Sequence, residues 1–381
     1  MSNKEVLEEN FEEDSGIAAG EIYYYDEQLL LQELPDEKVS PRTVSPFFLP
    51  TKRIPKQFID AVRSYSDDEL VSLFKGELPL LSKRVKIYWP VESEKKDNPP
   101  YDETQLELYG SVAVSDDRAV LDAITGMAGL LEVGTGVTLL DVTNSLELDV
   151  DFDADVLEPN RPLSHDASWH HIEVSKLLSH LGLKNSTPNK KTIRTRLERI
   201  SKMVFLQRFF KGGTELSNVR QFRIVVDDGI IYLCNQKKLP TRSSRGVNTY
   251  TDILIGISSS YRRENEDSGF LSRERLHKVY PTLNKSKIMD FLKWLDSNTR
   301  LFFNLKYLTW AIERYFESHP TNSTSQNKSH IQHEMFRNVL LESDLLEAHF
   351  NLRLVKRERK DLPPRYKGID YQIIYNGKVS S

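Results

Sequence analysis

The stretch 172–226 constrains the fold more than any other part of the chain, because two helical periods follow each other there at close range. Between 173 and 181, apolar residues recur at the three- and four-residue steps of one helix face, and Gly182 follows as a stop signal. Thr187-Pro188 then supplies an N-cap and a first-turn proline. The pattern predicts a second helix, 187–203, a short turn after the first.

A hairpin pattern follows this helix pair directly. Two strand patterns, 205–210 and 219–226, flank a turn at 211–214 that contains two glycines. Helix, short turn, helix and hairpin, in this order, are typical of a winged helix-turn-helix.

The second helix of the pair is expected to have one apolar face and one basic face. At about 100° per residue, Ile193, Leu197 and Ile200 fall within one narrow arc. The opposite arc carries the donors and cations that a helix in the major groove needs. On this arc we expect Lys191 and Arg194 to read bases, and we expect arginines of the hairpin to hold phosphates. The full set of expected DNA contacts here is Lys190, Lys191, Arg194, Thr195, Arg199, Lys202, Arg208, Lys211, Arg220 and Arg223.

Charge is segregated along the chain, although the net charge of the 381 residues is only −4. The segment 184–245 holds 15 Lys and Arg against 4 Asp and Glu, whereas 100–160 holds 14 acidic residues and a single basic one. Segregation of this kind is typical of a protein with a polyanionic partner, and a solvated basic face is the alternative. We expect the acidic segment to belong to the first domain and to face away from DNA or toward another subunit.

A weaker version of the same order of elements returns about a hundred residues later. Helical patterns at 250–261, 272–279 and 284–297 precede a short strand pattern at 301–305. This predicts a second winged-helix domain. The DNA contacts expected in it are Lys285, Ser286, Lys287 and Lys293.

These patterns predict an α+β chain of two tandem winged helix-turn-helix domains with a flexible acidic N-terminal tail. The expected divisions are 1–45 for the tail, 46–235 for the first winged-helix domain, 246–318 for the second, 319–330 for a linker and 331–381 for a C-terminal helix and strand. Within the first domain we expect helices at 56–75 and 116–131, and strands at 84–91, 106–114, 137–142 and 146–152.

Several classes of function are not expected. The chain has no apolar run long enough for a membrane helix and no N-terminal signal pattern, and its one cysteine, Cys234, fits a cytoplasmic protein. The alternating aspartates of 149–155 lack the glycine and glutamate of a calcium loop, and the histidines of 165–180 lack the spacing of a zinc site. There is no P-loop and no nucleophile with its base, so we expect no enzyme, no cofactor and no metal.

Three stretches resemble TrfA-type plasmid replication initiators, within the class of iteron-binding Rep proteins. Gln28-Leu29-Leu30-Leu31 resembles the core of a peptide that binds the sliding clamp, although Gln32 stands where such a peptide usually has Phe. Ser45-Pro46-Phe47-Phe48, followed by Lys52-Arg53-Ile54-Pro55, resembles the segment that enters the first domain of the family. The stretch 191–210, followed by 222–227, resembles its DNA-binding helix and wing.

The resemblance implies binding to repeated origin sites in double-stranded DNA, local opening of the duplex and recruitment of host replication proteins. The implied partners are the sliding clamp, the replicative helicase and the host initiator, with a second copy of the chain in a monomer–dimer equilibrium. Gln28, Leu29 and Leu31 would contact the clamp. Two alternatives remain open, a winged-helix transcriptional regulator and an interaction scaffold that binds no nucleic acid.

Overall fold

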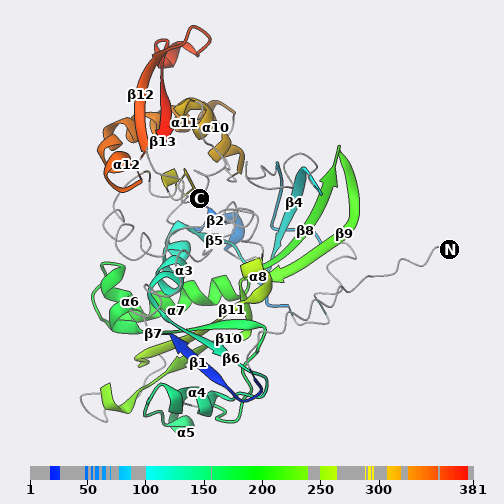
Figure 1. The fold of residues 1–381 in the computed structure, drawn as a ribbon, viewed down its shortest axis with the longest axis vertical. Helices are drawn as coiled ribbons and strands as arrows, with labels where there is room; N and C mark the ends of the chain where they lie inside the picture. Colours follow the sequence, from blue (N-terminus) through cyan, green and yellow to red (C-terminus); the bar gives the residue numbers. More distant parts are fainter. Residues whose placement is uncertain are drawn as a thin grey trace, which may run out of the picture.

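The computed structural model of the chain is drawn in Figure 1. It describes residues 18–25, 48–49, 53–54, 56–59, 62–65, 69, 77–86, 100–155, 157–238, 249–263, 288, 291–292, 294–295, 307–318, 325–350 and 352–375. These residues form a mixed α+β structure with several sheets. None of the helices in these ranges is long and apolar enough to cross a membrane.

A five-stranded antiparallel sheet is the centre of the first group of elements. Its strand order is β1 (Ile22–Tyr25), β6 (Gly129–Val133), β7 (Ala167–Glu173), β11 (Asp252–Ser258) and β10 (Val225–Leu233). One face is covered by α3 (Ser115–Met127), α6 (Val174–His180) and α7 (Thr187–Ser201), as Figure 1 shows. The opposite face is covered by α4 (Leu139–Ser145) and α5 (Phe152–Asp155).

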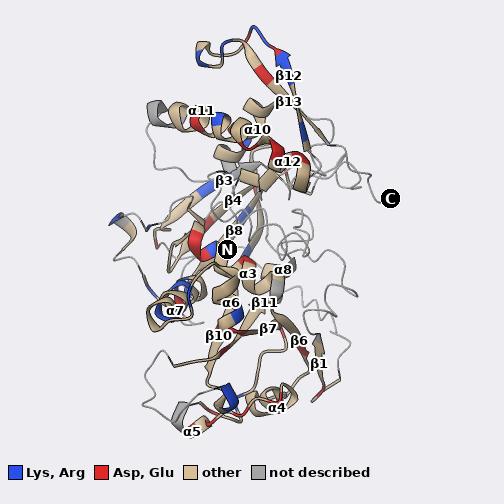
Figure 2. Cartoon of the chain, turned by 90° about the vertical axis from the view of Figure 1, so that its left-hand side faces the viewer, with Lys and Arg blue, Asp and Glu red and all other residues tan. Residues whose placement is uncertain are grey.

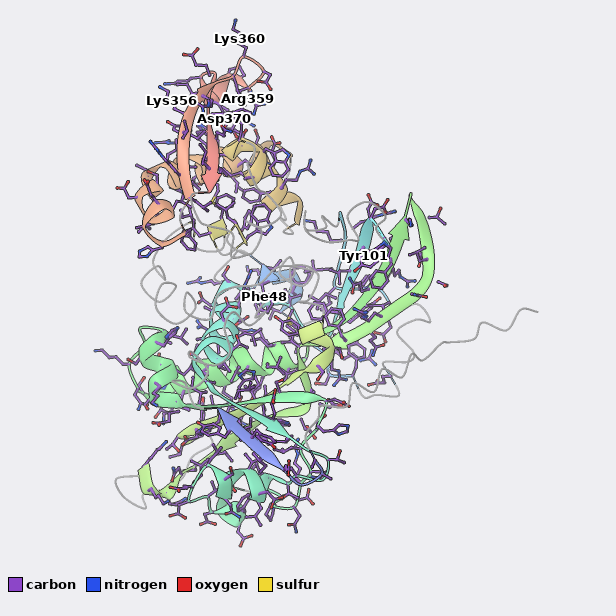
Figure 3. All side chains as sticks on the ribbon, in the orientation of Figure 1. Phe48, Tyr101, Lys356, Arg359, Lys360 and Asp370 are labelled. Carbon is purple, nitrogen blue, oxygen red and sulfur yellow. The ribbon has the colours of Figure 1, made fainter. Side chains whose placement is uncertain are left out.

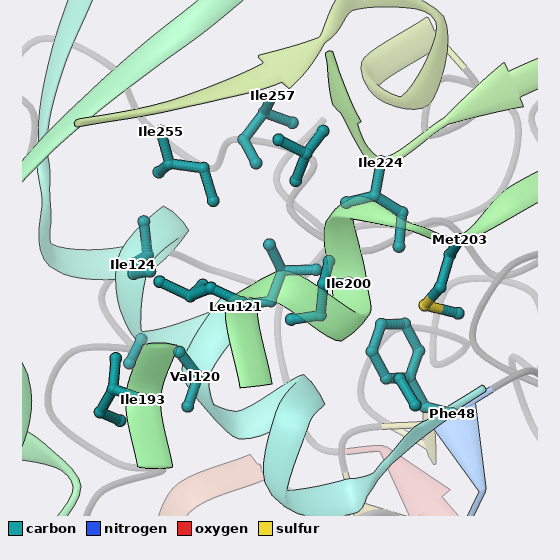
Figure 4. Close-up of a cluster of buried hydrophobic side chains, with 14 of the residues drawn as sticks. Phe48, Val120, Leu121, Ile124, Ile193, Ile200, Met203, Ile224, Ile255 and Ile257 are labelled. Atoms are coloured by element: carbon teal, nitrogen blue, oxygen red, sulfur yellow. The ribbon is translucent and has the colours of Figure 1, made fainter. Parts of the chain in front are cut away.

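Alternation along β11 shows why this sheet needs helices on both faces. Ile253, Ile255 and Ile257 are buried in the core that contains α3 and α7, whereas Leu254 is buried in the core that contains α4. Successive side chains of a strand point to opposite faces, so an apolar strand of this kind requires two cores. Figure 4 shows the first core, with Ile255 and Ile257 facing Ile124 of α3.

A second, four-stranded antiparallel sheet is formed by β3 (Leu81–Lys86), β4 (Glu103–Tyr109), β8 (Val204–Lys211) and β9 (Thr214–Arg223), in that order. The β8–β9 turn is Gly212-Gly213, with φ of 57° and 83°. A two-residue hairpin turn of this type requires positive φ at both positions, which glycine adopts without strain. A short parallel pair, β2 (Phe48–Leu49) and β5 (Ala113–Val114), lies beside α3.

The C-terminal group has a core of its own, which contains residues from Ile288 to Ile373. Its elements are α10 (Leu308–Ser318), α11 (Ser325–Leu341), α12 (Ser343–Phe350), β12 (Leu352–Glu358), the short helix η9 (Pro364–Tyr366) and β13 (Ile369–Tyr375). Strands β12 and β13 form an antiparallel hairpin, and Tyr307 pairs with Gln372 on the other side of β13.

The expectation of a helix at 250–261 is wrong. Residues 252–258 form β11, all seven are buried, and the short helix α8 (Ser259–Arg263) follows. Because both faces of the sheet are covered, the strand is an unbroken apolar run, and periodicity alone cannot distinguish such a run from a helix. Residues 249–263 therefore belong to the first group of elements, although they fall within the range 246–318 expected for the second domain.

The strands expected at 137–142 and 146–152 are also wrong. Helix α4 occupies most of the first, and in the second Val150 forms only an isolated bridge with Asn235 before α5 begins at Phe152. Helix α4 begins with a capping box, in which the Thr138 side chain accepts from the Asp141 backbone N–H and the Asp141 carboxylate accepts from the Thr138 N–H. This Thr-x-x-Asp spacing is a helix start signal. The apolar residues around it resemble a strand pattern and conceal the signal in the sequence.

Three further expectations are corrected near the ends of the groups. β1 lies in the five-stranded sheet, although it falls within the expected tail 1–45. The expected helix 56–75 is interrupted, because 56–58 form only the short helix η2 (Lys56–Phe58) and 62–65 are not helical. Helix α11 begins at Ser325, inside the expected linker 319–330. Gln28, Leu29 and Leu31 lie outside the described residues.

Candidate nucleic-acid interface

The candidate interface is built on the helix pair α6–α7. Strand β7 runs directly into α6, the chain turns after Leu181 into α7, and the hairpin β10–β11 then pairs with β7 through β11. The sequence pattern placed the hairpin of this unit at β8–β9. The structure instead places β8 and β9 in the separate four-stranded sheet, so that β10–β11 is the hairpin beside the helix pair.

Helix α7 is held in place by contacts with α3, α6 and β10. It begins at Thr187, with Ser186 in the N-cap position where the sequence pattern placed Thr187, and Pro188 lies in its first turn. Ile193, Leu197 and Ile200 are fully buried, as the sequence predicted. The apolar side of α7 packs against α3 and the five-stranded sheet, so its remaining side is the one open to a partner.

The open side of α7 is a ridge with residues at steps of three and four. Lys191, Thr195 and Glu198 are exposed, and Lys202 at the C-terminal end is half-exposed. Lys191 and Lys202 have no ion pair among the residues that the structure describes. Figure 2 shows Lys and Arg along this helix. Unpaired ammonium groups in this position are suited to anionic oxygens, because no internal ion pair has to be broken first.

Arg194 and Lys190 lie on the flank of the ridge that faces β10. Nε of Arg194 is 2.9 Å from Oε1 of Glu198, and its guanidinium lies 4.7 Å from the ring centre of Tyr232. Nζ of Lys190 donates to the carbonyl oxygen of Tyr250 at 2.9 Å, and burial lowers the pKa of this lysine. These contacts hold Arg194 at the edge of the ridge. Lys190 is half-buried and its ammonium group is occupied by the backbone carbonyl of Tyr250.

The opposite flank is tied to α3. Arg196 is 2.8 Å from the carboxylate of Asp116. Arg199 binds the fully buried carboxylate of Asp117 through both Nε, at 3.1 Å, and a terminal nitrogen, at 2.5 Å. Such a two-point contact uses the donors that Arg199 would need for a base or phosphate, so its geometry favours a structural role.

The expected contacts on β8–β9 lie apart from α7, in the four-stranded sheet. Arg208 lies between Glu107, at 3.5 Å, and Glu215, at 3.1 Å. Arg223 pairs with Asp227 and donates to the carbonyl oxygen of Tyr65 at 2.7 Å. Arg220 lies 5.8 Å from the ring centre of Phe209, and Lys211 is exposed beside the turn. Lys285, Ser286, Lys287 and Lys293 lie outside the described residues.

A buried polar cluster at the loop end of the β10–β11 hairpin was not expected from the sequence. Asp252 is fully buried. Its carboxylate accepts hydrogen bonds from the Thr251 hydroxyl at 2.7 Å and from Nζ of Lys238 at 3.0 Å. It also lies 3.1 Å from Nε2 of His171. Burial alone would raise the pKa of Asp252, but these hydrogen bonds outweigh it and hold the pKa below its usual value. The pair Lys237-Lys238 was the only sequence signal for this cluster.

No group of three or more His, Cys, Asp or Glu side chains is placed to hold a metal ion in the described part of the chain. The alternating aspartates of 149–155 do not form a strand, because α5 begins at Phe152.

No known protein family and no curated protein matches the sequence. The chain is similar in fold to domains 2 and 3 of RctB. With a crystal structure of selenomethionine derivatives of these domains, the TM-score is 0.46 at 13% identity, over 89% of this chain and 100% of that chain. With a structure of RctB 155–483, the TM-score is 0.40 at 14% identity, over 87% and 95%. At this identity the likeness is one of fold alone.

Proposed function

We propose that the chain binds double-stranded DNA and that α7 enters the major groove. The order strand, helix, turn, helix, hairpin, with sheet order β7-β11-β10, is that of a winged helix. The observation that carries the proposal is the ridge of α7, where Lys191, Thr195 and Lys202 face outward while α3 and the sheet fix the helix from behind. A rigid helix that presents donors on its open side is the arrangement that reads base edges.

The same order of elements occurs a second time, and we propose that it forms the second winged helix. Tyr307, which pairs with β13, precedes α10 and α11, and the hairpin β12–β13 closes the unit. Tyr307, β13 and β12 thus correspond to β7, β11 and β10. On this proposal the second unit spans 307–375, whereas the sequence pattern indicated 246–318.

We further propose that the protein is a replication initiator that binds repeated origin sites and recruits host replication proteins. The support is the sequence resemblance of 191–210 and 222–227 to TrfA-type initiators, together with two DNA-binding units in one chain. Two tandem units can contact successive turns of one duplex, which is what a site longer than a single helical turn requires.

DNA binding is tested by selecting duplexes from a random pool with the full chain, followed by measurement of affinity for the selected sequence. Replacing Lys191 and Thr195 by Ala is expected to weaken binding to the selected sequence by about 1–3 kcal/mol and to relax its discrimination from random sequence. Lys211→Ala, on the β8–β9 turn, is the control and should leave discrimination unchanged. Absence of any enriched sequence would contradict the proposal.

Initiation is tested on a replicon that carries the gene with its flanking DNA. If the protein is an initiator, deletion of the gene abolishes replication of this replicon, and the gene restores it when supplied from elsewhere. A transcriptional regulator of the same architecture would change only transcript levels.

A further inference from the structure

The hairpin β12–β13 is the most basic element of the C-terminal unit. The range 352–375 holds seven Lys and Arg against three Asp and Glu. In Figures 1 and 2 the hairpin projects away from α10, α11 and α12 at one end of the molecule. Its base is anchored in the core through Leu352 and Ile373. Leu362 and Tyr366, between the two strands, also pack on this core, Tyr366 against Phe336 of α11 with 5.0 Å between the ring centres. This apolar packing does not explain the positive charge of the hairpin.

One of the seven cations, Arg359, is half-buried and forms ion pairs with two of the three acidic residues. Arg359 binds Asp361 and also Asp370, at 3.0 Å, and its guanidinium lies 4.2 Å from the ring centre of Tyr307. Asp370 is fully buried and also accepts from the backbone N–H of Thr309. Figure 3 shows Arg359 beside Asp370, below the tip of the hairpin. This cluster fixes the hairpin on α10.

The other six cations are exposed to solvent. Lys356, Lys360 and Lys367 are exposed and have no ion pair in the described ranges. Lys360 lies at the tip of the hairpin in Figure 3. The remaining three are Arg353, Arg357 and Arg365, of which the last two bond only to the neutral side chains of Gln372 and Ser329 among described residues. The hairpin therefore carries a concentrated positive charge that Glu358 alone does not offset.

Helix α11, the counterpart of α7 in this unit, lacks a comparable surface. Its exposed ridge consists of His330, Glu334, Arg337 and Leu341, so Glu334 and Arg337 cancel in charge. Leu341 is 80% exposed. A helix that reads base edges needs an array of donors and acceptors on its outer side. The described face of α11 presents one cation, one anion and a large apolar side chain instead.

We propose that the second unit binds DNA through the β12–β13 hairpin as a clamp on the phosphate backbone, without reading sequence, and that α7 supplies the discrimination. This rests on the proposed function of the chain as a DNA-binding protein. Lysines on a two-stranded ribbon reach phosphate oxygens as point charges, and such contacts position a protein without distinguishing base pairs. The two units thus divide affinity and specificity between them.

The test uses the full chain with Lys356, Lys360 and Lys367 all changed to Gln, which removes charge and keeps side-chain length. Each lost phosphate contact lowers the salt slope of binding by roughly 0.9, so the triple variant should lose about two to three units of slope. Its affinity should fall roughly 10- to 100-fold for the selected sequence and for a random duplex alike. The ratio of the two affinities should stay at the wild-type value.

Two control proteins make the outcome decisive. The variant with Lys→Arg at the same three positions keeps the charge and should retain both affinity and slope. Arg337→Gln removes a charge from the ridge of α11 and should change neither. Equal affinity and slope in the Gln variant, with an unchanged melting curve, would overturn the proposal, as would a changed affinity ratio. If the wild-type chain binds no duplex at all, the failure belongs to the proposed function and not to the hairpin.

Discussion

Asp117 and Arg199 join α3 to α7 at the level of single residues. The Asp117 carboxylate is fully buried, accepts from the backbone N–H of Val114 and accepts from two nitrogens of Arg199, Nε and one terminal nitrogen. In Arg199→Ala a buried carboxylate loses its cation, which should lower the free energy of unfolding of this unit by about 2–4 kcal/mol. Amide hydrogen exchange in α3 and α7 measures this. Arg199→Lys keeps the charge but not the two-point contact, so its free energy of unfolding should lie between those of the wild type and Arg199→Ala. A loss of DNA affinity with unchanged protection would instead indicate that Arg199 contacts DNA.

Asp252 makes the loop end of the β10–β11 hairpin sensitive to acid. Its pKa is lowered in the folded chain, so it stabilises the fold above the ordinary aspartate pKa of about 4, and this stabilisation is lost as the pH falls through the folded value. Asp252→Asn should therefore be less stable than the wild type at neutral pH and should show a flatter fall in stability below pH about 4. Thermal melts of both proteins at a series of pH values give the slope of stability against pH for each. Parallel slopes would contradict this role.

At the scale of elements, β1 docks on β6 through two glycines. A Cβ on Gly134 would lie 2.0 Å from the carbonyl oxygen of Ala18, and one on Gly129 would lie 2.5 Å from the hydroxyl of Tyr24. Gly134→Ala should therefore displace β1 and raise the proteolytic sensitivity of 18–25. In a chain that lacks residues 1–25 the clash is absent, so the same substitution should cost no stability. An equal cost in both backgrounds would mean that the glycine is required for another reason.

The elements that could be predicted from the sequence are those with a local signal. Helices α3, α6 and α7 are amphipathic with clear starts or stops, and the Gly212-Gly213 turn identifies the β8–β9 hairpin. Strand β11 gave no alternation because it is covered on both faces. The polar start of α11 matched a linker in composition, although its later residues pack in the C-terminal core. The hairpin that accompanies α7 could not be predicted, because it depends on the pairing of β11 with β7, which is distant in sequence.

The candidate interface was predictable to a similar extent. The outward arc of α7, with Lys191 and Thr195, followed from helical periodicity alone. The partners that occupy the arginines did not, because they come from distant parts of the chain: Asp117 lies 82 residues before Arg199, and Tyr65 lies 158 residues before Arg223. Ion pairs of this range depend on the packed fold, and no spacing in the sequence reveals them.

At the scale of the whole molecule, the described cores do not overlap. The cores around the five-stranded sheet draw their buried residues from 48–261, and the C-terminal core draws its own from 288–373. Units with separate cores are able to fold on their own. Each unit should therefore be separable and should retain its own mode of DNA binding.

Separation of the units gives a final prediction. A fragment of residues 1–263 keeps α7 and should discriminate the selected sequence from random duplex by the wild-type ratio. It should bind both sequences at least roughly tenfold more weakly, because it lacks the hairpin clamp that the intact chain holds at high effective concentration. Adding the fragment 288–375 in trans should not restore the affinity, since the covalent link is what supplies that concentration. Fluorescence anisotropy titrations with the selected and the random duplex measure both affinities and their ratio. Full affinity in the first fragment would show that the second unit does not contact DNA, and lost discrimination would show that it helps to read sequence.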